Sequence, residues 1–98
     1  MAIDVYLRNE QGETLDSVNG VFLQPAMPAM DDESSPCLRF IDPCGDTIFN
    51  RRQMAPLLRE LSKSRAIVGI DPESIDGIAA LIERCAAGTH LYLWFVGD

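Results

Sequence analysis

The stretch Leu38–Asn50 constrains the fold more than any other part of this 98-residue chain. Its centre reads Asp-Pro-Cys-Gly-Asp, a composition typical of a tight turn. Pro43 fixes φ near −65° at the second turn position, and Gly45 can supply the left-handed residue of a three-residue hairpin loop. Because β-prone runs flank the turn, we expect a β-hairpin with strands at Leu38–Ile41 and Thr47–Phe49.

The hydrophobic period changes directly after this stretch, which indicates a helix. Asn50 is a suitable N-cap, and Gln53 can complete a capping box with it. Apolar residues then recur at the spacing of one buried helical stripe. They are Met54, Leu57, Leu58 and Leu61. Pro56 lies too deep for a first-turn proline, so we expect a distorted opening turn or a helix that begins near Ala55.

A second helix is predicted from Asp71, Pro72 and Glu73. These residues supply a cap, a first-turn proline and a negative charge at the positive end of the helix. An apolar stripe runs on to Cys85, and Gly88 is a suitable terminator.

Two segments have the pattern of strands. Apolar and polar residues alternate over Ile3–Arg8, which predicts a strand with one buried face. The segment His90–Val96 is largely apolar on both faces, which suits a central strand. The segment Thr14–Leu23 is ambiguous, because its apolar spacing fits a helix while Asn19-Gly20 would break one. The segment Gln24–Pro36, rich in Pro, Ser and Asp, predicts an irregular loop.

This order of elements predicts an α+β fold in one domain, residues 1–98. Each helix has a single apolar stripe to bury. We therefore expect a small antiparallel or mixed sheet, of about three to five strands, with both helices packed on one face.

The net charge of −7 is the most prominent global property of the chain. One interpretation is that this charge simply keeps a small protein soluble, and the other is that it selects the partner. Nucleic acids and anionic membranes are disfavoured as partners, since binding to phosphates depends on Lys and Arg. A basic protein partner is favoured. No apolar run approaches the roughly 18 residues that cross a bilayer, and no signal peptide is visible, so we expect a cytoplasmic protein.

The sequence does not predict an enzyme, a metal site or a cofactor. Three cysteines, Cys37, Cys44 and Cys85, lack CxxC spacing, which favours reduced thiols over a disulfide between Cys37 and Cys44. His90 is the single histidine, and no motif places a base or an oxyanion donor near a cysteine. Phosphate-binding and nucleotide-binding glycine motifs do not occur in the sequence.

Eight residues are candidates for contact with a partner. Six are acidic and lie in the irregular loop and at the start of the second helix: Asp31, Asp32, Glu33, Asp71, Glu73 and Asp76. The other two, Tyr92 and Trp94, would form an exposed aromatic strip on the last strand if no element covers it. Two alternatives remain open, namely that the loop covers these aromatic side chains and that the loop itself is only a solvated connection.

The segments Phe40–Asn50, Gln53-Met54 and His90–Asp98 resemble a group of small bacterial proteins that share a Phe-Ile-Asp-Pro-x-Gly-Asp-Thr-x-Phe-Asn stretch. The resemblance covers about a third of the chain and implies no particular activity. In that group the position of Cys44 is commonly aromatic. In size, acidity and lack of catalytic motifs, the chain is also similar to immunity proteins, the single-domain inhibitors of cognate toxins.

We therefore expect an acidic protein-binding module, an immunity protein that neutralises a basic toxin by direct binding. One alternative is a homo-oligomeric structural module, such as a homodimer formed through the last strand. Another is a small ligand-binding or enzymatic domain with a pocket around His90, Tyr92 and Trp94.

Overall fold

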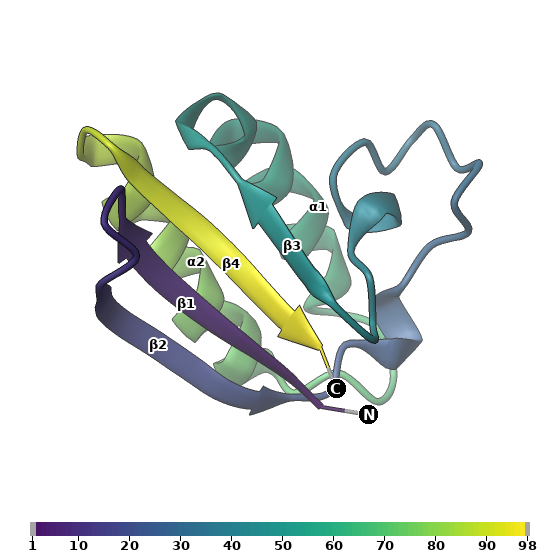
Figure 1. Ribbon diagram of the computed structural model, residues 1–98. Coiled ribbons are helices and arrows are strands. Elements are labelled where there is room, and N and C mark those ends of the chain that lie inside the picture. Colours follow the sequence, from purple (N-terminus) through teal and green to yellow (C-terminus); the bar gives the residue numbers. More distant parts are fainter. Residues whose placement is uncertain (1, 98) are drawn as a thin grey trace.

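A four-stranded antiparallel sheet carries two α-helices on one face in the computed structural model, which describes residues 2–97 (Figure 1). The expected α+β fold is thereby confirmed. The sheet order is β2-β1-β4-β3, and every neighbouring pair is antiparallel. The strands are β1 (Ile3–Asn9), β2 (Thr14–Val21), β3 (Asp46–Phe49) and β4 (Leu91–Gly97). The helices are α1 (Met54–Ser64) and α2 (Pro72–Ala87).

Strand alternation decides which side chains enter the core. Val5 pairs with Phe95 and Leu7 with Leu93, and all four side chains are buried beneath the helices. Phe49 on β3 completes this layer, with its ring edge-to-face against Phe95 at a centroid distance of 5.6 Å. The central position expected for the last strand is confirmed, because β4 lies between β1 and β3.

The side-chain caps predicted ahead of the two helices are both formed. The Asn50 side chain accepts from the Arg52 N–H, and Gln53 returns a bond to the Asn50 N–H, which completes the capping box. This box opens a short 3-10 turn, Arg51–Gln53, before α1 begins at Met54, so the distorted opening turn is confirmed. At α2, the Asp71 carboxylate accepts from the Glu73 N–H.

The predicted hairpin around Asp42–Asp46 is wrong. The turn exists, with the Asp42 carboxylate accepting from the Cys44 N–H at 2.9 Å, but Leu38–Phe40 forms a 3-10 turn. β3 pairs with β4 instead. Gly45 does not have a positive φ, so the left-handed residue expected there is also absent from this turn.

The reason for this error lies in helix α1. The buried carboxylate of Glu60 accepts the backbone N–H groups of Cys37 and Leu38, at 3.0 and 3.1 Å. These donors are therefore not free for a β-ladder. Such a contact between residues 22 positions apart leaves no signal in the local sequence.

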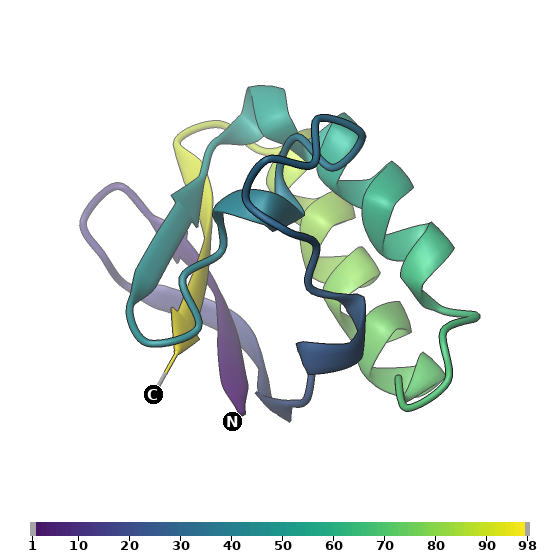
Figure 2. The ribbon, with the colours of Figure 1, turned by 90° about the vertical axis from the view of Figure 1, so that its right-hand side faces the viewer.

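Residues 22–45 close the side of the sandwich next to β3. Figure 2 shows this long connection passing between the sheet and the helices. Its buried side chains join the core formed by the sheet and the helices. They are Leu23, Cys37, Leu38 and Ile41. Apart from the short 3-10 helix Gln24–Ala26, the segment Gln24–Pro36 is irregular, as expected.

Three smaller expectations are also decided. The ambiguous segment Thr14–Leu23 is mainly strand β2. The last strand begins at Leu91 rather than His90, which has φ 55° in the preceding turn. The three cysteines are free; Cys37 and Cys85 are buried, and Cys44 is exposed.

Candidate functional site

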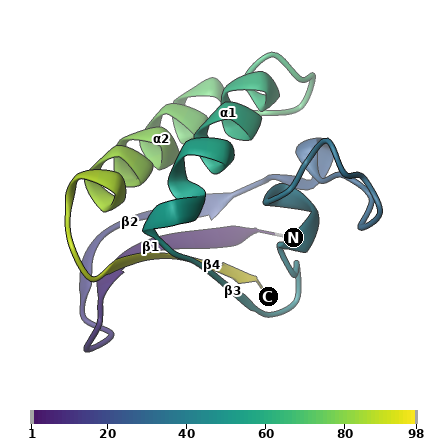
Figure 3. The same ribbon diagram turned by 90° about the horizontal axis from the view of Figure 1, so that it is seen from above.

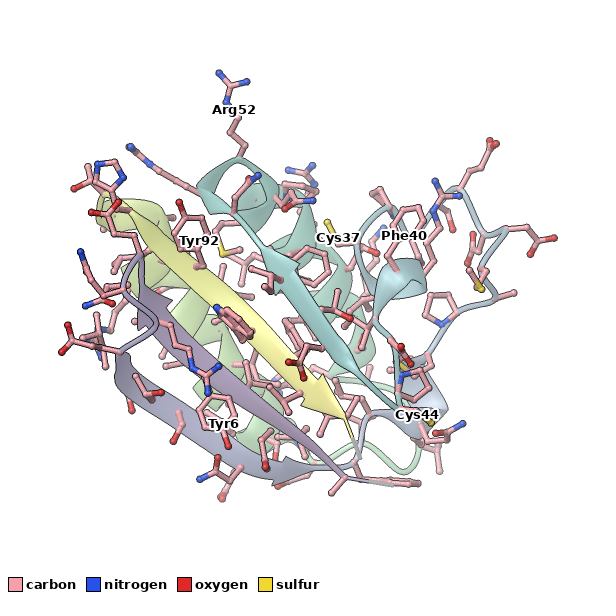
Figure 4. All side chains as sticks on the ribbon, in the orientation of Figure 1. Tyr6, Cys37, Phe40, Cys44, Arg52 and Tyr92 are labelled. Carbon is pink, nitrogen blue, oxygen red and sulfur yellow. The ribbon has the colours of Figure 1, made fainter. Side chains whose placement is uncertain are left out.

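The helix-free face of the sheet, which we call the open sheet face, carries a group of exposed or partly exposed side chains, of which five are apolar or aromatic and one is an arginine. Figure 3 shows both helices on the other face, with residues 24–41 beside the sheet rather than across it. In Figure 4, Tyr6 and Tyr92 project from the uncovered side. The six residues are Tyr6, Arg8, Ile48, Tyr92, Trp94 and Val96.

Strand register places three of these side chains in one row across the sheet. Ile48 pairs with Trp94, and Trp94 pairs with Tyr6. The guanidinium carbon of Arg8 lies 4.5 Å from the ring centroid of Tyr6 and 4.7 Å from that of Trp94. Because Arg8 Nε also donates to Thr14 Oγ1, at 3.1 Å, the guanidinium is held in a fixed position over the two rings.

A hollow of about 410 Å³ lies between this face and the turn that joins β1 to β2. Ile48, Tyr92 and Trp94 line one side, and the turn Asn9–Gly12 lines the other. The Asn9 side-chain oxygen accepts from two backbone N–H groups within the turn, which fixes its shape. The arrangement gives a shallow surface with an aromatic floor.

His90 lies outside this hollow. Its side chain is 70% exposed, and Nδ1 lies 3.4 Å from a carboxylate oxygen of Glu10. The structure therefore brings Tyr92 and Trp94 together in this hollow, whereas His90 lines a smaller neighbouring hollow of about 150 Å³ with Tyr92 but without Trp94.

Charges of opposite sign lie at the two ends of the open sheet face. Asp4 and Asp46 both pair with Val96, so two carboxylates lie at the end near Val96. The Asp4 carboxylate accepts from the Gly20 N–H at 2.7 Å. Near Tyr92, Arg51 donates to a backbone oxygen on α2, and Arg52 points away from the body of the molecule (Figure 4).

The predicted acidic loop residues differ in their surroundings. Asp31 and Glu33 are exposed, whereas Asp32 accepts from both the Ser34 hydroxyl and the Ser34 N–H. These hydrogen bonds hold the pKa of Asp32 below its usual value, because they stabilise the carboxylate.

The predicted acidic residues of α2 are engaged within the chain in two of three cases. Asp71 caps the helix, and Asp76 forms a bidentate ion pair with Arg65, at 2.9 and 3.1 Å. The Arg65 side chain lowers the pKa of Asp76 through this contact. Glu73 is exposed. The start of α2 lies in the helix layer, away from Tyr92 and Trp94 on the opposite face of the sheet (Figure 3).

The sequence did not identify Tyr6, Arg8 and Ile48 as neighbours of Tyr92 and Trp94 on the open sheet face. The alternation of Ile3–Arg8 shows that Tyr6 and Arg8 share a face. It cannot show that β1 lies next to β4, and this pairing is what brings Arg8 to Trp94.

The thiols offer little nucleophilic chemistry at the two buried positions. Burial, followed by the nearby Glu60 carboxylate, raises the pKa of Cys37 to about 11. Burial also raises the pKa of Cys85. Among residues 2–97, no cluster of three or more potential metal ligands occurs, and no helix is long and apolar enough to cross a bilayer.

Comparison with known proteins finds no match to a protein-family model, to a curated protein or to a solved structure.

Proposed function

We propose that the protein is a binding module that neutralises a basic protein partner by direct contact, in the manner of an immunity protein. The observation that carries this proposal is the open sheet face, where aromatic side chains remain partly exposed. On the same strand as Tyr92 and Trp94, the Leu93 and Phe95 side chains that face the helices are completely buried.

The chemistry of this face suits protein recognition. Tyr and Trp are enriched at protein interfaces, where they bury large areas and lose few rotatable bonds. Tyr6, Tyr92 and Trp94 are carried on two paired strands, so their backbone positions are fixed before a partner arrives. Ile48 and Val96 add apolar area beside them.

The charge of the chain supports a basic partner. Fifteen acidic residues exceed eight basic ones, and Asp4 and Asp46 lie at one end of the open sheet face. Complementary charges of this kind raise the rate of association, while desolvated aromatic contacts prolong the complex. A second copy of this chain fits less well, because each copy brings a charge of −7 to the contact.

Capture from a lysate of the source cells by immobilised protein tests the proposal. We expect one stoichiometric basic partner that is lost when the wash is changed from low to high salt. With that partner purified, Trp94→Ala should weaken binding about thirtyfold or more, as truncation of an interface hot spot does. The matched control is Val68→Ala. Val68 is 94% exposed and lies in the loop that joins α1 to α2, away from the open sheet face.

Two charge variants separate the open sheet face from the acidic loop. Asp46→Asn should slow association and reduce its salt dependence, whereas Asp31→Asn should do so only if the loop contacts the partner. Equal binding by Trp94→Ala and Val68→Ala would overturn the assignment of this face. Recovery of the protein alone, with self-association in sedimentation, would favour the homo-oligomeric alternative.

A further inference from the structure

A second hollow, of about 480 Å³, lies beside β3, on the side away from Tyr92 and Trp94 of the open sheet face. It is formed where the irregular loop passes the segment Arg39–Pro43, near the labelled Phe40 in Figure 4. We call it the loop groove. Its volume falls in the range of about 300–1,000 Å³ that is typical of small-molecule sites. Its apolar lining is contributed chiefly by Met27, Pro28, Met30, Phe40 and Pro43.

One wall of the loop groove is held by contacts to the core. Glu60 binds the backbone N–H groups of Cys37 and Leu38, which anchors the 3-10 turn that carries Arg39 and Phe40. Leu38 and Ile41 are buried on either side of these two residues. The opposite wall contains Met27 and Met30, whose unbranched side chains adapt to different shapes.

Arg39 indicates which chemical class of ligand the loop groove would bind. Its guanidinium lies over the Phe40 ring, with the central carbon 4.7 Å from the ring centroid. Its Nε is buried, and no hydrogen-bond acceptor within residues 2–97 reaches it. A buried donor without an acceptor is costly and uncommon. Because Nε is shielded from solvent, a ligand would meet Arg39 through the part of the side chain that lines the groove. The Arg39 charge also acts on the Asp32 carboxylate and helps to lower its pKa.

We propose that the loop groove binds a small amphipathic carboxylate. The apolar body of the ligand lies against Met27, Met30 and Phe40, and the carboxylate accepts from the Arg39 guanidinium. A carboxylate suits this position because its oxygens match the planar fork of an arginine and form charge-assisted bonds with it. The Asp42 carboxylate also lines the groove, but it accepts from the Cys44 N–H within its own turn.

Calorimetric titration with octanoate, below its micelle-forming concentration, tests this assignment. We expect saturable binding with one site per chain. The alcohol 1-octanol has the same apolar body without the charge and should bind about tenfold more weakly or worse, because it lacks a charge-assisted bond. Absence of saturable octanoate binding at millimolar concentration would overturn the proposal.

A pair of arginine variants locates the charge. Arg39→Gln should weaken octanoate binding about tenfold or more and leave 1-octanol binding nearly unchanged. Arg52→Gln removes the same charge from an exposed side chain that points away from the molecule, so it should change neither ligand's binding. Equal octanoate affinity in the two variants would contradict the role of Arg39.

A second pair of variants keeps the test independent of folding defects. Met30 is 76% exposed, so its replacement should leave the fold intact. Met30→Glu and Met30→Gln have nearly the same shape and differ in charge. Met30→Glu should therefore bind octanoate several-fold more weakly than Met30→Gln, because it places a second carboxylate beside the ligand. Identical affinities would place the ligand outside the loop groove.

Discussion

The two faces of the sheet are built from neighbouring residues of the same strands, yet they differ in almost every physical property. On the helix side, Leu93 and Phe95 are completely buried. On the open side, Tyr92 and Trp94 are partly exposed, and Arg8 lies over the Trp94 ring. One face is closed by packing, and the other is formed by aromatic rings and a cation that remain in contact with water.

This difference separates stability from recognition along a single strand. A completely buried side chain loses both its transfer free energy and its packing when it is truncated. A partly exposed side chain has less to lose in the free protein, so it can be optimised for contact with another molecule. The following predictions test this division, from the largest expected effect to the smallest.

The strongest test compares adjacent residues on β4. Phe95→Ala should lower the free energy of unfolding by about 3–5 kcal/mol, because it opens a cavity against Phe49 and the helices. Trp94→Ala should lower it by only about 1 kcal/mol, since its side chain is already partly hydrated. Urea titration followed by circular dichroism measures both. If Phe95→Ala does not fold, Phe95→Leu should give a measurable but smaller loss of unfolding free energy. The comparison would be contradicted if Trp94→Ala lost more unfolding free energy than both Phe95→Leu and Phe95→Met.

The helix side also contains a buried polar anchor, whereas the carboxylate of Asp4 on the open sheet face makes its backbone hydrogen bond at an exposed position. Glu60→Ala should destabilise the protein by about 2–3 kcal/mol, because the N–H groups of Cys37 and Leu38 lose their acceptor in a buried site. Glu33→Ala, at an exposed position, is the control and should change stability by less than about 0.5 kcal/mol. Urea midpoints provide the measurement, and equal midpoints for the two variants would contradict the anchoring role.

The buried thiol of Cys37 gives the helix side a pH dependence. Folding raises the pKa of Cys37 from 9.0 to about 11, so the unfolded chain loses this proton first as the pH rises. The stabilisation that the neutral thiol contributes to the fold is therefore complete below pH 9.0 and is lost progressively toward about pH 11. After solvent screening is taken into account, the loss is on the order of 1 kcal/mol. Cys37→Ser should flatten the fall in urea midpoint over this window, whereas Cys44→Ser, at the exposed turn, should leave the slope unchanged.

The smallest effect is expected from the cation on the open sheet face. Arg8→Gln should destabilise the protein by no more than about 1 kcal/mol, the value of an exposed cation–π contact. It should nevertheless change the local environment of Trp94, which is the single tryptophan of the chain. Increased quenching of tryptophan fluorescence by acrylamide would show that Arg8 covers the ring. Unchanged quenching would indicate that the guanidinium does not occupy this position in solution.

Much of the fold could be predicted because its signals are local. The capping box at Asn50, the cap at Asp71 and the alternation of β1 each specify an element within a few residues. The expectation of an α+β fold with both helices on one face followed from these elements and is confirmed.

The errors and omissions concern contacts between distant residues. Glu60 holds Cys37 and Leu38 from another element, which converts a predicted strand into a 3-10 turn. The pairing of β1 with β4 brings Arg8 to Trp94, and no local pattern contains that pairing. Of the candidate contact residues, Tyr92 and Trp94 share one surface. The role of all eight candidates in contact with a partner stays a prediction.

The position of Arg8 has a consequence for selectivity. Any cation that approaches Tyr6 or Trp94 meets rings already shared with an internal competitor. Such a cation must displace the Arg8 guanidinium from the rings, because it does not find an unoccupied cation site there. Unstacking Arg8 at a cost of about 0.5–1 kcal/mol would reduce the affinity of every such ligand by about two- to fivefold. Arg8 therefore lowers the affinity for small, isolated cations. Only a ligand with additional contacts across the strands gains enough binding free energy to displace Arg8.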